Sequence, residues 1–360
     1  AGARWLRALP HVSARLAGLD PTALEQFGGV PAASEGPRPG LLKARFYSRG
    51  VEEWYLLPTR RLCAATLRLF RFVDGNTRPA VHANISGGAA AATLQQPREL
   101  PVVVLFAGDA AMNRDLDAHE AALLGELHTF GISLVIAGLC GLGDGLWRGG
   151  LWEFAPLLLG RTHVGLHAEE VLRVIAWVLG ALGAGSLVLV ATGATAPAVL
   201  HAALHVPRAA ARHGQRRSRG DVGSGSSSEP AAGSGGVLAG VALVRGMCCF
   251  MDIASAQHHR MPWQMQMHGV LEHYDLADLL AALAAPAGPS ALIMEPRGPT
   301  EESLSWRRTM DTYGLAAHRF AAAGRRLQLL AGWRGPAAEA EALASFAVAA
   351  GEQRRGRRGR

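Results

Sequence analysis

The chain has 360 residues, of which 49% are hydrophobic and 18% are charged. That much apolar material excludes a wholly disordered chain, and four cysteines in such a length exclude a disulfide-stapled secreted scaffold. The formal net charge of +7 comes from segments 208–236 and 352–360, whose arginines outnumber their acidic residues. Because the excess charge lies in a linker and a tail, and not on a folded face, we expect no nucleic-acid partner.

Residues 1–43 are expected to form an N-terminal extension. Residues 1–19 contain basic residues and no acidic one, which is typical of the remnant of an organelle transit peptide. The alternative is an amphipathic helix that packs on the domain through Trp5, Leu6 and Leu9. The location is therefore open, and we expect a soluble intracellular protein, with an organelle as one option.

Residues 44–350 are predicted to form a single α/β domain. The segments 44–58 and 62–73 alternate apolar and polar residues, which indicates antiparallel strands. From residue 100 onward, short apolar runs alternate with helical stretches, which predicts a mostly parallel sheet with helices on both faces. The expected strands of this part are 102–106, 134–137, 187–190, 237–244, 291–294 and 327–330, and the expected helices lie near 115–129, 165–182, 196–205, 276–285, 301–323 and 336–350.

Three segments depart from this alternation. Residues 208–236 are rich in Arg, Gly and Ser, and we expect a disordered insertion in a surface loop, with a basic binding segment as the alternative. Residues 351–360 are expected to form a basic tail. Residues 174–200 are uncharged, but glycines between 180 and 185 divide them into a helix, a turn and a strand, so we predict no membrane span.

Ligands of an open parallel sheet bind at the carboxyl ends of its strands. After the first predicted parallel strand come Ala107, Gly108 and Asp109, whose backbone N–H groups are candidates for binding a substrate oxyanion. After the second, residues 138–144 are rich in glycine but match neither the P-loop nor the G-x-G-x-x-G pattern. We therefore expect no cofactor.

The segment 191–196 has the layout of a nucleophile elbow, a tight strand-to-helix turn in which small residues flank the nucleophile. With Ala191 and Thr195 at the small positions, the nucleophile position is Gly193, which has no side chain. The N–H group of Ala194 is a further oxyanion-donor candidate. Thr192 or Thr195 is a hydroxyl nucleophile only if the register of the turn shifts. The alternative is a structural hydrogen bond at the start of the helix.

Two longer stretches carry a resemblance to a known family. They are LGRTHVGLHAEEVL at 159–172 and GVLEHYDLADL at 269–279, the second followed by Ala-Ala-Pro at 284–286. Both resemble bacterial acetyl-xylan-esterase-like hydrolases of the α/β-hydrolase superfamily, in which "G-R-x-x-x-G-x-R-x-x-D" and "H-Y-D-L-x-D-L…A-P-R-P" runs occupy these places. The resemblance covers roughly residues 44–335. It implies an α/β-hydrolase fold and a carboxylic ester hydrolase with a serine, an acid and a histidine.

The chain departs from that family at the triad. The acid position is filled by Glu295, but residues 331–335, after the last strand, contain no histidine, and His318 precedes that strand. A triad needs its nucleophile, base and orienting acid within hydrogen-bond reach. We therefore predict a catalytically impaired protein of this lineage; the alternative is an active carboxylic ester hydrolase with a non-standard nucleophile. The expected ligand is a small ester or acyl compound, and the oligomeric state is open.

No metal site is expected. Neither Cys140 nor the adjacent pair Cys248 and Cys249 matches a zinc-binding spacing, and Cys140 is predicted to be a small buried thiol. Between residues 251 and 273, histidines and methionines concentrate without a helical i, i+4 histidine pair. Metal binding there is an alternative to a lid-like segment that packs over the pocket. The residues of this segment are His258, His259, His268, His273, Met251, Met261, Met265 and Met267.

Overall fold

The computed structural model describes residues 40–47, 50–60, 63–72, 100–107, 115–142, 156, 158, 160–182, 184–206, 237–332 and 334–358. The segment 208–236 and most of the predicted extension 1–43 lie outside these residues, so the division of the chain into extension, domain, insertion and tail stays a prediction.

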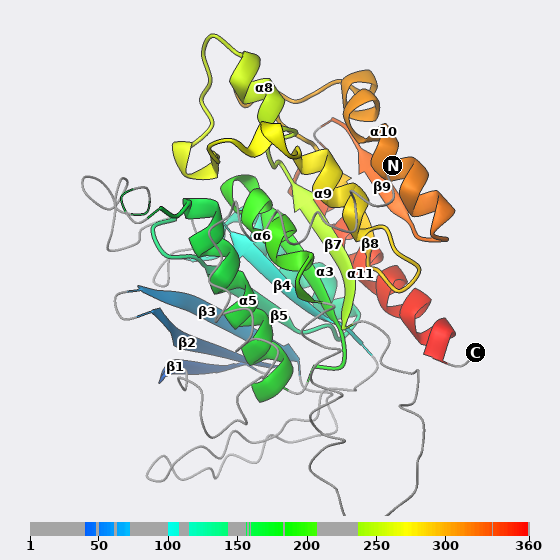
Figure 1. The fold of residues 1–360 in the computed structure, drawn as a ribbon. Coiled ribbons are helices and arrows are strands. Elements are labelled where there is room, and N and C mark those ends of the chain that lie inside the picture. The colour runs from blue at the N-terminus through cyan, green and yellow to red at the C-terminus, as the bar shows by residue number, and fades with distance from the viewer. Residues whose placement is uncertain are drawn as a thin grey trace, which may run out of the picture.

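One nine-stranded sheet forms the centre of the molecule (Figure 1). The strand order is β1-β2-β3-β5-β4-β6-β7-β8-β9. The pairs β1–β2, β2–β3 and β3–β5 are antiparallel, and all the other neighbouring pairs are parallel. This confirms the predicted mostly parallel sheet with an antiparallel N-terminal part. The strands are β1 (Gly40–Tyr47), β2 (Gly50–Arg60), β3 (Cys63–Phe72), β4 (Val102–Ala107), β5 (Leu134–Gly138), β6 (Leu187–Thr192), β7 (Leu238–Val244), β8 (Ser290–Met294) and β9 (Leu327–Leu330).

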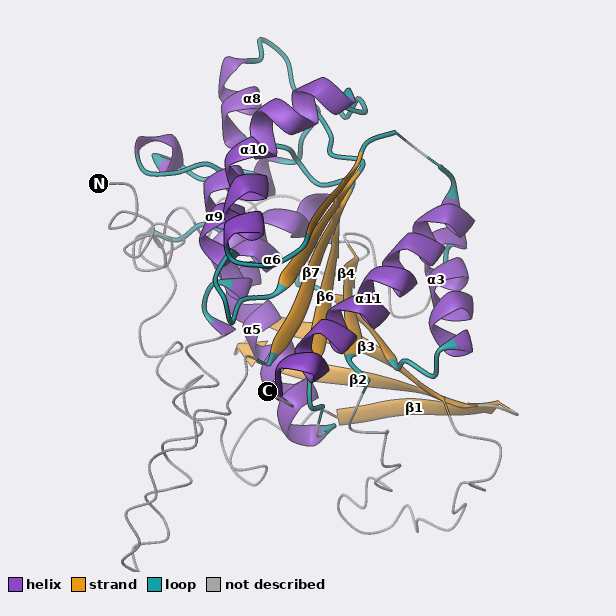
Figure 2. Ribbon diagram, turned by 90° about the vertical axis from the view of Figure 1, so that its right-hand side faces the viewer, coloured by secondary structure: helices purple, strands orange, loops and turns teal. Residues whose placement is uncertain are grey.

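Helices cover both faces of the sheet, as predicted (Figure 2). On one face α3 and α11 pack against each other, and on the other lie α5, α6, α9 and α10. β4, β6, β7 and β8 are buried along their length apart from the half-buried Thr192, because each face supports its own apolar core. The helices are α3 (Ala118–Thr129), α5 (His163–Ala181), α6 (Ala196–Ala203), α8 (Phe250–Ser255), α9 (Leu276–Leu283), α10 (Trp306–Ala322) and α11 (Pro336–Arg358), with 3-10 turns η1 (Gly193–Thr195), η2 (Trp263–Met265) and η3 (Val270–Glu272).

Two details differ from the sequence-based expectation. The segment 44–58 belongs to two strands, because the chain reverses between Tyr47 and Gly50, which face each other across the hairpin. An alternating pattern continues across such a short connection and does not reveal the reversal. The last helix, expected to end near residue 350, continues to Arg358, and Arg354 donates hydrogen bonds to the carbonyl oxygens of Gly185 and Val237 at 2.7 and 3.1 Å.

Within the described residues, no helix combines the length and apolar character that crossing a bilayer requires. The segment 174–200 divides as predicted, into the end of α5, a connection, β6, and the turn into α6.

Candidate functional site

The turn after β6 has the geometry of a nucleophile elbow. β6 ends at Thr192, the turn η1 follows at once, and α6 begins at Ala196. Gly193 has φ +52°, a left-handed conformation that glycine adopts without steric cost. Among the described residues, no atom lies within 4 Å of the position that a Cβ of Gly193 would take. The predicted strand-to-helix turn at Gly193 is therefore confirmed, and no described residue crowds its tip.

Thr195, the alternative nucleophile, is fully buried at 0% exposure. Its hydroxyl lies 2.8 Å from the carbonyl oxygen of Phe106 on β4 and 3.0 Å from that of Thr192, and it accepts a hydrogen bond from the Thr192 N–H at 3.1 Å. These contacts tie the turn to the neighbouring strand. The geometry therefore favours the structural role for Thr195.

We expect Thr195→Val to lower the free energy of unfolding by about 1–3 kcal/mol, because it removes the acceptor of the Thr192 N–H and the 2.8 Å hydrogen bond to the carbonyl oxygen of Phe106. Urea denaturation measures this change. Thr129→Val is the matched control, since Thr129 is exposed and bonds only within its own helix end. An unchanged stability for Thr195→Val would contradict the structural role.

The ends of β6, β7 and β8 share an unusual backbone conformation. Each is followed by a residue in the left-handed region: Gly193 (φ +52°), Arg245 (φ +50°) and Glu295 (φ +50°). Arg245 and Glu295 still donate their N–H groups to Met294 and Leu330 on the next strands, at 2.9 and 2.7 Å. Left-handed non-glycine residues are rare and concentrate at functional sites. These two side chains thus leave the sheet at the end where ligands bind.

Glu295, the predicted acid of the triad, is buried, and one of its carboxylate oxygens accepts two hydrogen bonds. Its Oε1 accepts hydrogen bonds from Arg297 at 2.7 Å and from Ser303 at 2.9 Å. Its partners are thus a guanidinium and a hydroxyl, and no histidine is among the contacts that the structure shows for it. A triad acid orients an imidazole, so this geometry does not assemble one.

A cavity of about 60 Å³ lies between the sheet and the first turns of α3 and α11. Three charged or ionisable side chains meet at its wall. Arg245 donates to Oε2 of Glu339 at 2.6 Å, while Nδ1 of His119 lies 3.2 Å from Oε1 of Glu339. The guanidinium of Arg245 also lies 3.2 Å from Nδ1 of His119. The cavity is lined by Leu105, Ala107, Asp117, His119, Glu120, Leu123, Thr192, Arg245, Glu339, Ala340 and Leu343.

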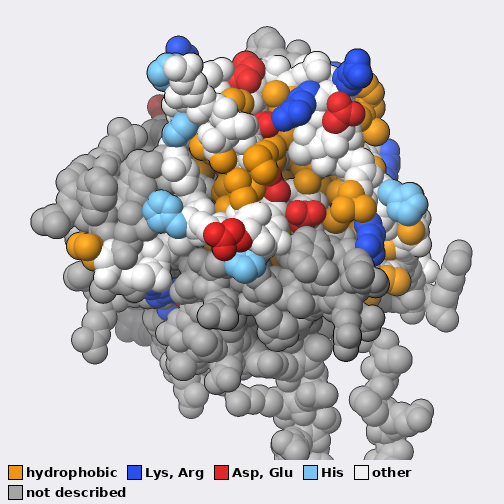
Figure 3. Space-filling model, turned by 45° about the horizontal axis from the view of Figure 1, so that its top comes forward, with side chains coloured by type: hydrophobic (Ala, Val, Ile, Leu, Met, Phe, Trp, Pro, Cys, Tyr) orange, Lys and Arg blue, Asp and Glu red, His pale blue; other side chains and the backbone are white. Residues whose placement is uncertain are grey.

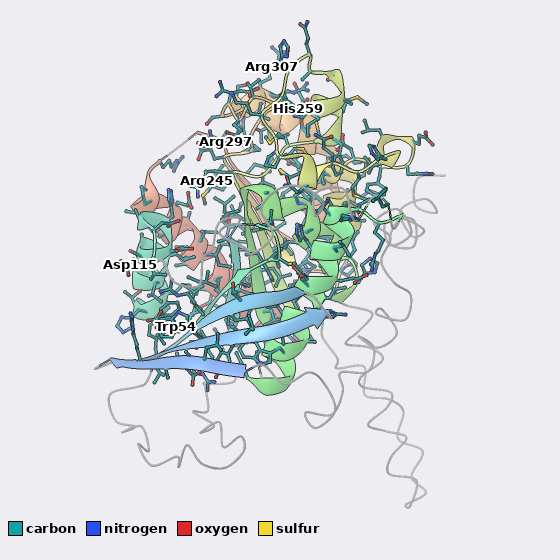
Figure 4. The ribbon with its side chains drawn as sticks, turned by 90° about the vertical axis from the view of Figure 1, so that its left-hand side faces the viewer. Trp54, Asp115, Arg245, His259, Arg297 and Arg307 are labelled. Carbon is teal, nitrogen blue, oxygen red and sulfur yellow. The ribbon has the colours of Figure 1, made fainter. Side chains whose placement is uncertain are left out.

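The pKa of Glu339 is raised above its ordinary value. Burial is the main cause, and the nearby charge of Glu295 adds to it, whereas Arg245 and His119 act in the opposite direction. Glu295 and Glu339 therefore face the same region. Figure 4 shows Arg245 and Arg297 at this end of the sheet, with His259 and Arg307 further out. Figure 3 brings this end forward and shows apolar side chains at its centre, with acidic, basic and histidine side chains around them.

The predicted oxyanion donors are only partly described. Ala107 ends β4 and lines the cavity, and Ala194 is the second residue of η1. Gly108 and Asp109 lie outside the described residues. Cys140 is a buried free thiol, as predicted; its N–H donates to Glu170 at 2.9 Å and its carbonyl oxygen lies 2.9 Å from Nε2 of His167, so α5 fixes the loop after β5.

Two buried histidines have structural partners. His167 bonds the loop after β5, and His201 lies 2.9 Å from the Tyr274 hydroxyl and 2.6 Å from the carbonyl oxygen of Pro197. Burial lowers the pKa of each to about 4, so both are neutral near pH 7. The surface histidines at 258, 259, 268 and 273 are exposed, while Met261, Met265 and Met267 pack into the core.

The sequence reasoning missed the group of His119, Arg245 and Glu339. The local sequence indicates only where the helices that carry His119 and Glu339 begin. Asp117 and Glu120 form a capping box that starts α3 and places His119 in its first turn, and Pro336 opens α11 just before Glu339. Nothing in either segment indicates the other.

Comparison with known proteins shows the fold. No protein-family model matches the sequence, and no curated protein matches it. A proposed acetyl xylan esterase from Bacteroides fragilis superposes with a TM-score of 0.53 at 11% identity, over 91% of this chain and 74% of that chain. Acetyl xylan esterase from Paenibacillus sp. R4 gives 0.51 at 14% identity, over 92% and 95%. The chain thus has the α/β-hydrolase fold, and its structural neighbours are esterases.

Proposed function

We propose that this protein is a non-hydrolytic member of the acetyl-xylan-esterase-like lineage that binds a small ester or acyl ligand at the C-terminal ends of β4, β6 and β7. One observation carries the proposal. The elbow keeps its tight left-handed turn, and no described residue crowds its tip, but the residue at the tip is Gly193, which has no nucleophilic atom.

The chemistry of ester hydrolysis explains why this matters. Acyl transfer requires a nucleophile, a base within hydrogen-bond reach of it, and donors for the oxyanion. Thr195 is buried and bonded, Glu295 is engaged by Arg297 and Ser303, and no histidine follows β9 in the sequence. Donors without a nucleophile bind a carbonyl compound but do not cleave it.

The cavity beside the elbow supports a small acyl ligand. Leu105, Ala107, Leu123 and Leu343 give it an apolar wall, and Arg245 gives it a positive group. A volume of about 60 Å³ leaves room for a short acyl group such as acetyl. The carbonyl oxygen of such a group accepts hydrogen bonds, so a guanidinium at the wall favours it.

A second candidate is an active ester hydrolase with Thr192 as the nucleophile. The observation in its favour is that Thr192, His119 and Glu339 line the same cavity, and that Glu339 contacts Nδ1 of His119 as a triad acid contacts its base. Two contacts argue against this candidate. The Thr192 hydroxyl donates to the carbonyl oxygen of Phe106 at 3.3 Å, and the carboxylate of Glu339 that contacts His119 also accepts a hydrogen bond from Arg245.

The test is to measure binding and turnover on the same purified protein. We expect saturation-transfer NMR to detect methyl acetate or another short acyl ester at the protein, with no release of acetate. Ala340→Leu, which narrows the cavity, should weaken this binding, and circular dichroism checks that the variant folds.

Each other outcome has a definite meaning. Turnover of about 1–1000 per second, typical of enzymes, that is lost in His119→Ala would establish the second candidate. Binding that Ala340→Leu leaves unchanged would place the ligand elsewhere, and absence of both binding and turnover would refute the ligand part of the proposal.

A further inference from the structure

A group of potential metal ligands lies beyond the end of β7, outside the cavity described above. The two sulfur atoms of Cys248 and Cys249 and a carboxylate oxygen of Asp252 lie within 4.8 Å of one another. All three residues are buried, with exposures of 0%, 6% and 8%. Neither cysteine forms a disulfide in the structure.

The carboxylate of Asp252 points to a missing partner. Arg308 of α10 donates to Oδ1, but Oδ2 is buried and has no hydrogen-bond partner among the described residues. Buried carboxylate oxygens are normally bonded, because leaving one unpaired costs free energy. A cation shared with the two neighbouring sulfur atoms would satisfy it.

The backbone around this group is fixed by three other segments. Met247 forms a β-bridge with Arg297, and the carbonyl oxygen of Cys248 accepts a hydrogen bond from the hydroxyl of Tyr313 at 3.0 Å. The N–H groups that follow, of Phe250 and Met251, donate to the carboxylate of Asp275 at 2.6 and 3.0 Å. Ligands held in this way need little reorganisation on binding.

We propose that Cys248, Cys249 and Asp252 bind a thiophilic divalent cation, with Zn²⁺ as the best match. Zinc takes cysteine sulfur and carboxylate oxygen as ligands, and with three protein ligands it keeps a fourth position for water. Binding releases the two thiol protons to the buffer. The ligands then carry three negative charges, which the cation and Arg308 together balance. The bound ion holds the segment after β7 to α10.

Ligand spacing did not indicate this site, because zinc motifs are recognised by ligand pairs separated by two or more residues. Here two ligands are adjacent, and the third lies one helical turn away on α8. The proposal does not depend on the proposed function, because it concerns other residues and another ligand.

Titration of the reduced full-length protein with Co²⁺ tests the site directly. We expect one Co²⁺ per chain, with the intense sulfur-to-cobalt charge-transfer and visible bands of tetrahedral thiolate coordination, and displacement of the Co²⁺ by Zn²⁺. Cys249→Ser and Asp252→Asn should each weaken binding at least about tenfold. Cys140→Ala is the matched control, a buried cysteine outside the group, and should bind like the wild type.

A measurement on the unaltered protein covers the case in which the variants fail to fold. Zn²⁺ should slow alkylation of Cys248 and Cys249, but not of Cys140, in the native protein, as read by peptide mass spectrometry. The proposal is overturned if the reduced protein binds no Co²⁺, if Zn²⁺ protects none of these thiols, or if binding survives Cys249→Ser and is lost on replacing the exposed His258 and His259.

Discussion

Gly193→Ser alone will produce no esterase. The variant supplies the hydroxyl that the elbow lacks, and the turn has room for it, since no described atom lies within 4 Å of the Cβ position. The positive φ costs a non-glycine residue about 1–2 kcal/mol, which the fold should tolerate. However, no histidine follows β9 to accept the proton of the serine. We expect release of p-nitrophenol from p-nitrophenyl acetate to stay at least about a thousandfold below the 1–1000 per second of ordinary enzymes.

Two further variants serve as controls for the activity measured with Gly193→Ser. Gly193→Ala carries the same backbone strain without the hydroxyl, so its background rate is the reference. If Gly193→Ser does hydrolyse the ester or react with a fluorophosphonate, the double variant with His119→Ala identifies the base. Loss of the activity in that double variant would show that His119 reaches the elbow, and our account of the missing base would be wrong.

Arg245→Leu will destabilise the protein, and more so at neutral than at acidic pH. Glu339 is buried and its Oε2 accepts a 2.6 Å hydrogen bond from Arg245. Removing the guanidinium leaves that carboxylate in a poorly solvated position near Glu295. Breaking a buried ion pair costs about 3–5 kcal/mol. Because Arg245 is 24% exposed, we expect a loss of about 2–4 kcal/mol of unfolding free energy at pH 8, measured by urea denaturation.

The pH dependence follows from the direction of the Glu339 pKa. Burial holds this pKa above its ordinary value of 4.5, against the attraction of Arg245. A carboxyl with a raised pKa in the folded state favours folding below its unfolded pKa, and this contribution disappears as pH rises through the folded pKa. Arg245→Leu raises the folded pKa further. The deficit should therefore grow as pH rises from the folded pKa of the wild type, which lies above 4.5, to the higher folded pKa of the variant, and shrink on acidification.

Two controls make this prediction specific. Arg307, on the exposed surface of α10, has no ion pair among those that the structure shows, so Arg307→Leu should change stability by no more than about 0.5 kcal/mol. Combining Arg245→Leu with Glu339→Gln should recover part of the loss, because the buried charge is then absent. A deficit that is constant with pH, or unrelieved by Glu339→Gln, would contradict the role assigned to this pair.

The sequence by itself determined the parts of the protein that depend on local periodicity and on the identity of single residues. Short apolar runs and helical stretches predicted all six parallel strands and six of the helices, because a strand buried on both faces must be apolar along its length. The turn at Gly193 was also predictable, since a sharp strand-to-helix turn admits only small residues. The glycine at the predicted nucleophile position and the lack of a histidine in residues 331–335, which led us to predict an impaired triad, were read directly from the sequence.

Only the tertiary structure decided which polar side chains meet. His119, Arg245 and Glu339 come from three distant segments, and they converge because α11 packs against both α3 and β7, the strand that Arg245 follows. The hairpin of β1 and β2 and the gathering of Cys248 and Cys249 with Asp252 were likewise not evident from spacing. Local patterns indicate which face of an element is buried. They do not indicate which other element covers that face, because this depends on strand order and long-range packing.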